Sequence, residues 1–295
     1  MRTYHPKAPS DPRPDPLLRI LNLGAGTQST AVALMHLDGT LPPIDAAIFA
    51  DTGWEPREVY DHLAKLRTSF AEANVPLIEV TAGNIRDDTL IPAEVGRSAT
   101  IPLHVKKLDG DGSGGIARRQ CTKEYKVMPL RRAILGLVAN RLAISAATWR
   151  DIPRDVYVEQ VFGISTDESS RARSPRDRWA INFYPLLLLG WRRGDTIAYL
   201  KRNGWDAPRS ACIGCPFHSD NEWRRLRDDH PDEWADAVAF DAEIRRVNAA
   251  SPERLEARGY LHRSLLPLAE VDLSTAEDHG QQSLFGGECE GMCGV

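Results

Sequence analysis

The feature of the sequence that most constrains its fold is a short apolar segment that passes through two glycines into a helical segment. Leu18 to Leu23 is mostly apolar and contains neither Gly nor Pro, so we expect a buried strand there. Residues 31–37 are predicted to be helical. A helix that follows such a turn has unpaired backbone N–H groups at its start, where the helix dipole adds positive charge. The turn therefore predicts an anion site, typically for phosphate.

The residues of this turn exclude two common nucleotide-binding motifs. The turn consists of Gly24, Ala25, Gly26, Thr27, Gln28, Ser29 and Thr30. The dinucleotide pattern G-x-G-x-x-G is absent because Ser29 stands in place of the third glycine, and the Walker pattern ending in G-K-[ST] is absent too. A plain structural connection between a strand and a helix remains the alternative to a phosphate site.

The following segments extend the same pattern. Residues 46–50 and 76–80 are predicted strands, and the second starts at a proline, which edge strands tolerate. A helix is expected from Pro56 to residue 73. The order β-α-β-α-β argues for an α/β fold with a doubly wound, mostly parallel, Rossmann-like sheet. Ligands of such sheets bind beyond the carboxyl ends of the strands, so Asp51 and the Gly24 turn should face one crevice.

The rest of the chain is expected to complete this domain and to add a helical region. Helices are predicted over residues 129–141, 195–203 and most of 221–248, and a strand over 156–164. Candidate core residues of the last helical stretch are Trp223, Leu226, Trp234, Val238 and Phe240. Residues 109–115 should form a surface loop or a mobile lid. We expect a flexible leader over 1–16, a nucleotide-binding domain over 17–205, a helical region over 206–280 and a cysteine-containing tail over 281–295.

Composition and charge exclude several classes of protein. The chain has 295 residues, of which 42% are hydrophobic and 26% charged, which is typical of a globular protein. Its net charge of −4 provides no overall positive field to attract nucleic acid. No apolar run approaches the roughly 20 residues of a membrane span, and the first 16 residues lack the apolar core of a signal peptide. We therefore expect no membrane association and a cytoplasmic, reducing location, where the five cysteines are metal ligands or redox thiols.

Two groups of residues carry further candidate chemistry. Cys212 and Cys215 have the C-x-x-C spacing that lets two thiolates hold one metal, either zinc or an iron–sulfur cluster. Zinc would need more ligands, for which Cys121, His218 and the tail cysteines are candidates, and two buried thiols without a metal are the alternative. The predicted strand 156–164 is followed by Glu168, Arg171, Arg173, Arg176 and Arg178. These arginines form either a solvated face or a clamp for an anion.

Several segments occur in the order of one known family's motifs. They are the turn Gly24 to Thr30; Phe49-Ala50-Asp51-Thr52-Gly53 followed by Glu58 and Tyr60; Cys121 with Lys126, Val127, Pro129, Leu130, Arg131 and Arg132; residues 163–171 with Glu168, Ser169 and Arg171; and residues 185–199 with Trp191 and Asp195. Together they resemble the phosphoadenosine phosphosulfate (PAPS) reductase family of the PP-loop superfamily, which has an adenine-nucleotide α-hydrolase-like fold. The resemblance covers residues 18–215, and the tail contains a further, partial match.

The resemblance implies a set of site residues and ligands. Nucleotide-binding residues would be Gly24, Ala25, Gly26, Thr27, Gln28, Ser29, Asp51, Thr52, Gly163, Glu168 and Arg171. The nucleotide would be ATP, PAPS or adenosine phosphosulfate (APS), the form of PAPS without its 3′-phosphate. Cys121, Cys212 and Cys215 would hold an iron–sulfur cluster of the 4Fe-4S type. Cys289 or Cys293 would be the catalytic thiol, regenerated by a thiol reductant such as a thioredoxin-like protein.

Three departures from the family pattern leave the reaction open. Gln28 replaces the aspartate of ATP-cleaving PP-loop enzymes, and an amide cannot help to hold a magnesium ion as a carboxylate would. Thr122 replaces the second cysteine of a pair, so three cysteines would leave one iron open, as in ATP-dependent thiolation enzymes. The tail sequence Glu288-Cys289-Glu290-Gly291 only partly matches the family's Glu-Cys-Gly motif, and Cys293 is additional. A disordered terminus with idle thiols is the alternative for the tail.

These observations support three hypotheses about function, which we rank from the best supported to the least supported. The first is a sulfonucleotide reductase-like oxidoreductase of sulfur metabolism. The second is an ATP-dependent sulfurtransferase that thiolates a base of RNA or DNA. The third is a catalytically silent sensor that binds a nucleotide and a cluster. The oligomeric state, with a homodimer among the options, stays open at this point.

Overall fold

The computed structural model describes residues 15–91, 101–107, 114–145, 148, 150–154, 156–175, 177–250, 257–274 and 278. The chain divides into two compact units that alternate along the sequence. The first unit comprises residues 1–51, 57–80 and 127–210, and the second comprises 52–56, 81–126 and 211–295.

The first unit contains a five-stranded parallel sheet, which confirms the predicted α/β, Rossmann-like fold. The strands lie in the order β3-β2-β1-β6-β7. Their bounds are Leu18–Leu23 (β1), Ala46–Asp51 (β2), Leu77–Thr81 (β3), Val158–Phe162 (β6) and Ala180–Phe183 (β7). The central strand β1 pairs with β2 on one side and with β6 on the other. Strand β3, which is preceded by Pro76, lies at one edge of the sheet.

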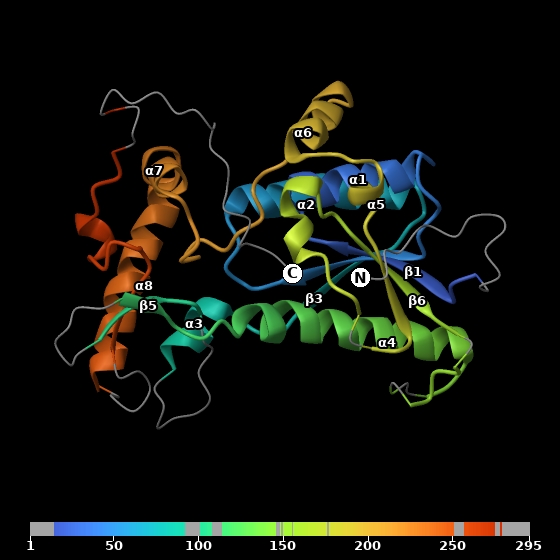
Figure 1. Cartoon of the computed structure of the whole chain (residues 1–295), viewed down its shortest axis with the longest axis horizontal. Helices are drawn as coiled ribbons and strands as arrows, with labels where there is room; N and C mark the ends of the chain where they lie inside the picture. The colour runs from blue at the N-terminus through green and yellow to red at the C-terminus, as the bar shows by residue number, and fades with distance from the viewer. Residues whose placement is uncertain are drawn as a thin grey trace. The chain divides into compact units, whose positions relative to one another are not determined.

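Helices cover both faces of this sheet (Figure 1). They are α1 (Thr27–Leu37), α2 (Arg57–Glu72), α4 (Met128–Leu142), α5 (Pro185–Leu188) and α6 (Arg193–Arg202). Alternate residues of a strand point to opposite faces, so each strand supplies two cores. Leu21 and Phe49 are buried on the face covered by α1 and α2. Their neighbours Ile20 and Ile48 are buried with Ile134 of α4 on the other face.

The second unit combines helices with a three-stranded antiparallel sheet that the sequence did not predict. The sheet has the order β5-β4-β8, with β4 at His104–Lys107, β5 at Gly114–Ile116 and β8 at Ala257–Tyr260. Its helices are α3 (Ile85–Leu90), α7 (Asp220–Asp229) and α8 (Pro231–Ala250). The helical stretch expected over 221–248 is thus two helices, because Pro231 starts the second one.

The core of the second unit includes the residues that the helical pattern predicted. Trp223, Leu226 and Phe240 are buried, and Trp234 and Val238 pack against them while partly buried. Residues 114 and 115, expected in a loop or lid, belong to strand β5, whereas residues 109–113 lie outside the described part of the chain. Among the described residues, no helix has both the length and the apolar character needed to cross a membrane.

A buried histidine makes the stability of the first unit dependent on pH. The Nε2 atom of His62 lies 2.8 Å from the Thr30 hydroxyl, and burial, assisted by the charge of Lys65, lowers the pKa of His62 to about 4 from 6.5. Because the folded pKa lies below the unfolded one, protonation favours unfolding, and stability is lost as the pH falls from about 6.5 towards 4. We expect His62 to account for about 2 kcal/mol of the loss between pH 7 and pH 5.

Urea unfolding at the two pH values measures this contribution. The His62→Gln variant should lose less stability between pH 7 and pH 5 than the unaltered chain. The unaltered chain at the same two pH values is the reference. Equal losses in the two proteins would show that His62 does not carry the effect.

Candidate functional site

The predicted phosphate loop connects β1 to α1 in the first unit. The helix begins at Thr27, four residues earlier than the predicted helical stretch, so that the loop proper is Gly24 to Gly26. The Ser29 hydroxyl accepts a hydrogen bond from the Gly26 N–H and donates one to the Gly26 carbonyl, both at 3.2 Å. The amides of Thr27 and Gln28 lie in the first turn, where a helix provides no partner for its N–H groups. These two amides are therefore available to an anion.

Ala25 gives this loop an unusual backbone conformation. Its φ is +53°, in the left-handed region that a residue with a Cβ rarely adopts, and its side chain is fully buried. Strained backbone of this kind persists where the surrounding structure enforces it, often at ligand-binding sites. A left-handed residue also changes the direction of successive N–H groups, which can form a concave anion-binding site. The loop therefore has a shape that its sequence alone did not indicate.

Gly163, the residue that follows β6, lies against the first turn of α1. A Cβ added to Gly163 would lie 2.7 Å from the backbone nitrogen of Ser29 and 2.8 Å from the Gln28 carbonyl carbon. These separations are far inside the roughly 3.5 Å at which carbon atoms make favourable contact. Only glycine therefore allows β6 to lie so close to the start of α1. Since β1 and β6 are neighbours at the point where the strand order reverses, the loop occupies the ligand-binding position of an open α/β sheet.

Polar side chains from two segments meet beside the loop. The amide of Gln28 donates to Glu168 Oε2 at 3.4 Å and to the Ser165 hydroxyl at 3.5 Å. Arg171 Nη1 lies 2.8 Å from Glu168 Oε2, and both side chains are mostly buried. Glu168 and Arg171 belong to a 3-10 helix, Thr166–Arg171, that follows β6. The structure thus places Gln28, Gly163, Glu168 and Arg171 close to one another.

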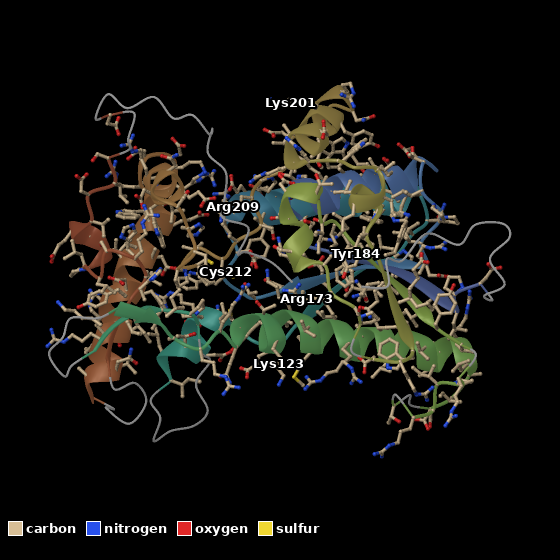
Figure 2. All side chains as sticks on the ribbon, in the orientation of Figure 1. Lys123, Arg173, Tyr184, Lys201, Arg209 and Cys212 are labelled. Carbon is tan, nitrogen blue, oxygen red and sulfur yellow. The ribbon has the colours of Figure 1, made fainter. Side chains whose placement is uncertain are left out.

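The other arginines of this segment do not join that group. The guanidinium of Arg173 donates to the backbone carbonyl of Ser170, and the backbone N–H of Arg173 donates to the Tyr184 hydroxyl at 3.1 Å (Figure 2). Arg178 Nη2 donates to the Ile152 carbonyl at 3.0 Å. Arg176 lies outside the described residues. In the described part of the chain, Arg173 and Arg178 therefore do not form a clamp with Arg171. Arg171 is the arginine of this segment that lies near the loop.

Asp51 and Thr52 are consecutive residues with different surroundings. Asp51 ends β2 in the first unit and accepts a hydrogen bond from the Tyr60 hydroxyl at 2.9 Å. Thr52 belongs to the second unit, where its side chain is buried and donates to Glu55 Oε1 at 2.9 Å. The Thr52 hydroxyl also lies 3.2 Å from the sulfur of Cys212. Thr52, predicted as a nucleotide contact, thus has its described hydrogen bonds in the cysteine region of the second unit.

Cys212, labelled in Figure 2, lies beside the buried side chains of Thr52 and Glu55 in the second unit. Its thiol donates to Glu55 Oε1 at 3.6 Å, and Lys126 Nζ lies 3.8 Å from the same oxygen. Burial and then the negative charge of Glu55 raise the pKa of the Cys212 thiol well above its ordinary value, against the smaller opposing effect of Lys126. The thiol is therefore protonated in this arrangement. Cys121 lies near this group, because its electrostatic interaction with Cys212 makes a small contribution to the raised pKa of the Cys212 thiol.

The Cys-x-x-Cys turn packs against the segment that follows β2. The Ile213 N–H donates to the Trp54 carbonyl at 2.9 Å, and the Trp54 ring covers Gly214 so closely that an added Cβ would lie 2.0 Å from it. Within the turn, the Cys215 N–H donates to the Cys212 carbonyl at 3.1 Å. His218 Nε2 lies 3.0 Å from that carbonyl and 3.2 Å from the Ile213 carbonyl, so it donates to the turn. His218, a candidate metal ligand, thus directs this nitrogen to the backbone.

The thiols of the second unit are the donor atoms of the expected metal site. Cys121, Cys212 and Cys215 are free thiols in the second unit, and Cys121 and Cys212 pack against the same hydrophobic core. Among the described residues, no group of three or more Cys, His, Asp or Glu side chains is arranged to hold a metal ion. The described residues thus contain no preformed metal site, and the iron–sulfur cluster stays a prediction from the resemblance. Cys289 and Cys293 lie outside the described residues, so their catalytic role stays a prediction.

Three residues of these sites were not assigned from the sequence. The Ser165 hydroxyl accepts a hydrogen bond from the Gln28 amide. Ser210 lies against the loop, because a Cβ added to Gly26 would come within 3.0 Å of the Ser210 Cβ. Glu55 is buried beside Cys212. Only Glu55 had a sequence signal, since a carboxylate just after a strand end is well placed for a site.

Comparison with known proteins adds no assignment: no family model matches the chain, and no curated protein matches it at a significant level of similarity.

Proposed function

We propose that the chain is an enzyme of sulfur chemistry that binds an adenine nucleotide or sulfonucleotide, as in the PAPS reductase family that its motifs resemble. One observation carries the proposal: the left-handed Ala25 leads into the N-terminus of α1 at the reversal point of the sheet, and Gly163 and Arg171 lie at the same loop. The first-turn amides of α1 would bind a phosphate or sulfate group. Arg171 would add a charge-assisted hydrogen bond.

The reaction that we favour is thiol-dependent reduction. A cysteine thiolate attacks the sulfur of the sulfonucleotide, the bond from that sulfur to the phosphate oxygen breaks, and the nucleotide leaves with the electron pair. A second thiol then attacks the cysteine sulfur, which releases sulfite and leaves a disulfide. The dithiol is oxidised by two electrons and the sulfonate is reduced. Cys289 or Cys293 would be the attacking thiol, and an external reductant such as a thioredoxin-like protein would restore it.

Gln28 supports this reaction over cleavage of ATP. Its amide is engaged with Glu168 and Ser165 and offers no carboxylate to a magnesium ion. The second candidate is ATP-dependent thiolation of a nucleic acid base, which is favoured by Thr122 in place of a further cysteine.

Product analysis separates the two reactions and the silent sensor. Incubation with PAPS or APS and a dithiol should release sulfite and the nucleoside phosphate. Release of AMP and pyrophosphate from ATP only when RNA or DNA is added would favour thiolation. Tight nucleotide binding without turnover in either assay would favour the sensor. Anaerobic purification with iron and sulfide assays tests the predicted cluster separately, and a colourless protein with one zinc would contradict it.

Loss of Arg171 tests the nucleotide site directly. We expect Arg171→Ala to weaken nucleotide binding about 10- to 100-fold, because a hydrogen bond between charged groups contributes about 1.5–3 kcal/mol. Isothermal titration calorimetry with PAPS and ATP measures the change. The neighbouring variant Arg173→Ala is the control, since Arg173 bonds to backbone carbonyls instead. Equal affinities for Arg171→Ala and the unaltered chain would remove Arg171 from the site.

A further inference from the structure

A second group with catalytic chemistry lies in the second unit, at the turn that follows β8. The ring of His262 is buried and joins two side chains. Its Nε2 lies 2.9 Å from Asp220 Oδ1, and its Nδ1 lies 2.8 Å from the Ser264 hydroxyl oxygen. Asp220 is the first residue of α7, so an aspartate, a histidine and a serine from two segments form one continuous hydrogen-bonded chain.

The backbone determines where the protons of this chain lie. The N–H of Ser264 donates to His262 Nδ1 at 3.1 Å, so Nδ1 must be the unprotonated nitrogen of the ring. The proton is then on Nε2, which donates to Asp220, and the Ser264 hydroxyl donates to Nδ1. This is the proton arrangement of a serine activated by a histidine that an aspartate orients, with the two ring nitrogens exchanged relative to the serine proteases.

The surroundings keep the histidine in place and leave the serine accessible. The second oxygen of Asp220 accepts a hydrogen bond from Arg263 Nη2 at 2.6 Å, which fixes the carboxylate. Ser264 is exposed, whereas His262 is only 4% exposed. Leu265, directly after the serine, has a φ of +60°, and its N–H donates to the His262 carbonyl at 3.1 Å. The serine therefore sits on a tight, strained turn, and strained turns are frequent at functional sites.

We propose that Ser264 is a nucleophilic serine that attacks carboxylic esters, with His262 as its general base and Asp220 as the group that orients the histidine. Ser264 Oγ forms a bond to the carbonyl carbon while its proton passes to His262 Nδ1. The carbon–oxygen bond to the alcohol then breaks, and the alcohol leaves with the proton from His262. Water, activated in the same way, releases the acid and restores the serine. This activity is independent of the nucleotide site.

Active-site labelling of the full chain tests the proposal. A fluorophosphonate probe, followed by peptide mass spectrometry, should modify Ser264 at least 10-fold faster than Ser145, an exposed serine of the first unit. Ser264→Ala should abolish the labelling and the hydrolysis of p-nitrophenyl butyrate. Asp220→Asn, which keeps the shape of the side chain, should slow hydrolysis by up to about 10⁴-fold and slow the labelling as well. Ser145→Ala should leave both unchanged.

Two results would overturn the proposal. One is labelling of Ser264 no faster than that of Ser145 in a chain whose unfolding transition is normal. The other is full hydrolysis by Ser264→Ala. In either case the hydrogen bonds of His262 would serve only to hold the turn against α7. Because Ser264 is exposed, its replacement should not affect folding, and the melting temperature of each variant checks this.

Discussion

Replacing Gly163 with alanine is expected to abolish nucleotide binding, with a loss of affinity of more than 100-fold. The added Cβ would lie 2.7 Å from the Ser29 nitrogen and 2.8 Å from the Gln28 carbonyl carbon and the Ser29 Cα. These are backbone atoms within the first turn of α1, so no side-chain rotation can relieve the contact. The helix start must move away from β6, and the amides proposed to bind phosphate move with it. We also expect a loss of about 1–3 kcal/mol in the free energy of unfolding.

A matched glycine in the same unit provides the control. Gly136 lies within α4, and an added Cβ there meets no atom within 4 Å. Gly136→Ala should keep full affinity and gain up to about 1 kcal/mol in stability, because alanine favours the helix. Calorimetric titration with PAPS and ATP, together with urea unfolding, measures both quantities. Unchanged affinity in a folded Gly163→Ala protein would exclude the helix start as the phosphate site.

The sheet of the first unit could be predicted because its signals are local. An apolar strand, a glycine turn and a helix follow one another within 20 residues, and the next strands repeat the pattern. The resemblance named Gln28, Glu168 and Arg171 as nucleotide-binding residues, but it did not indicate that their side chains contact one another. The left-handed Ala25 was not predictable, since alanine carries no sign of a positive φ.

The second unit was less predictable because its contacts join distant parts of the chain. Strand β8 pairs with β4 across about 150 residues, and neither strand is longer than four residues. Such short strands carry little of the alternating pattern that identifies a strand. Glu55 approaches Cys212 only after folding, so its effect on the thiol could not be read from the spacing of the cysteines. The iron–sulfur cluster accordingly stays a prediction from the resemblance.

Replacing Gly214 with alanine is expected to cause the largest loss of stability in the second unit, about 3 kcal/mol in the free energy of unfolding. The added Cβ would lie 2.0 Å from one carbon of the Trp54 ring and 2.4 Å from another. That ring is buried against Phe240, with a distance of 4.6 Å between ring centroids, and its nitrogen donates to Asp236 at 2.6 Å. The ring cannot turn aside without breaking these contacts, so the Cys-x-x-Cys turn must move instead.

Movement of the turn would pull Cys212 away from Thr52 and Glu55, and the now accessible thiol should react about 10-fold faster with a maleimide. Mass spectrometry of the Cys212 peptide measures this rate, and urea unfolding measures stability. Gly115→Ala is the control, because an added Cβ there makes only an ordinary contact of 3.5 Å with Val105. Trp54→Leu removes the ring that causes the clash, so the double variant Trp54→Leu with Gly214→Ala should be more stable than the sum of the two single losses predicts. Strictly additive losses would show that Gly214 and the Trp54 ring do not interact, and that something other than this packing determines the position of the turn.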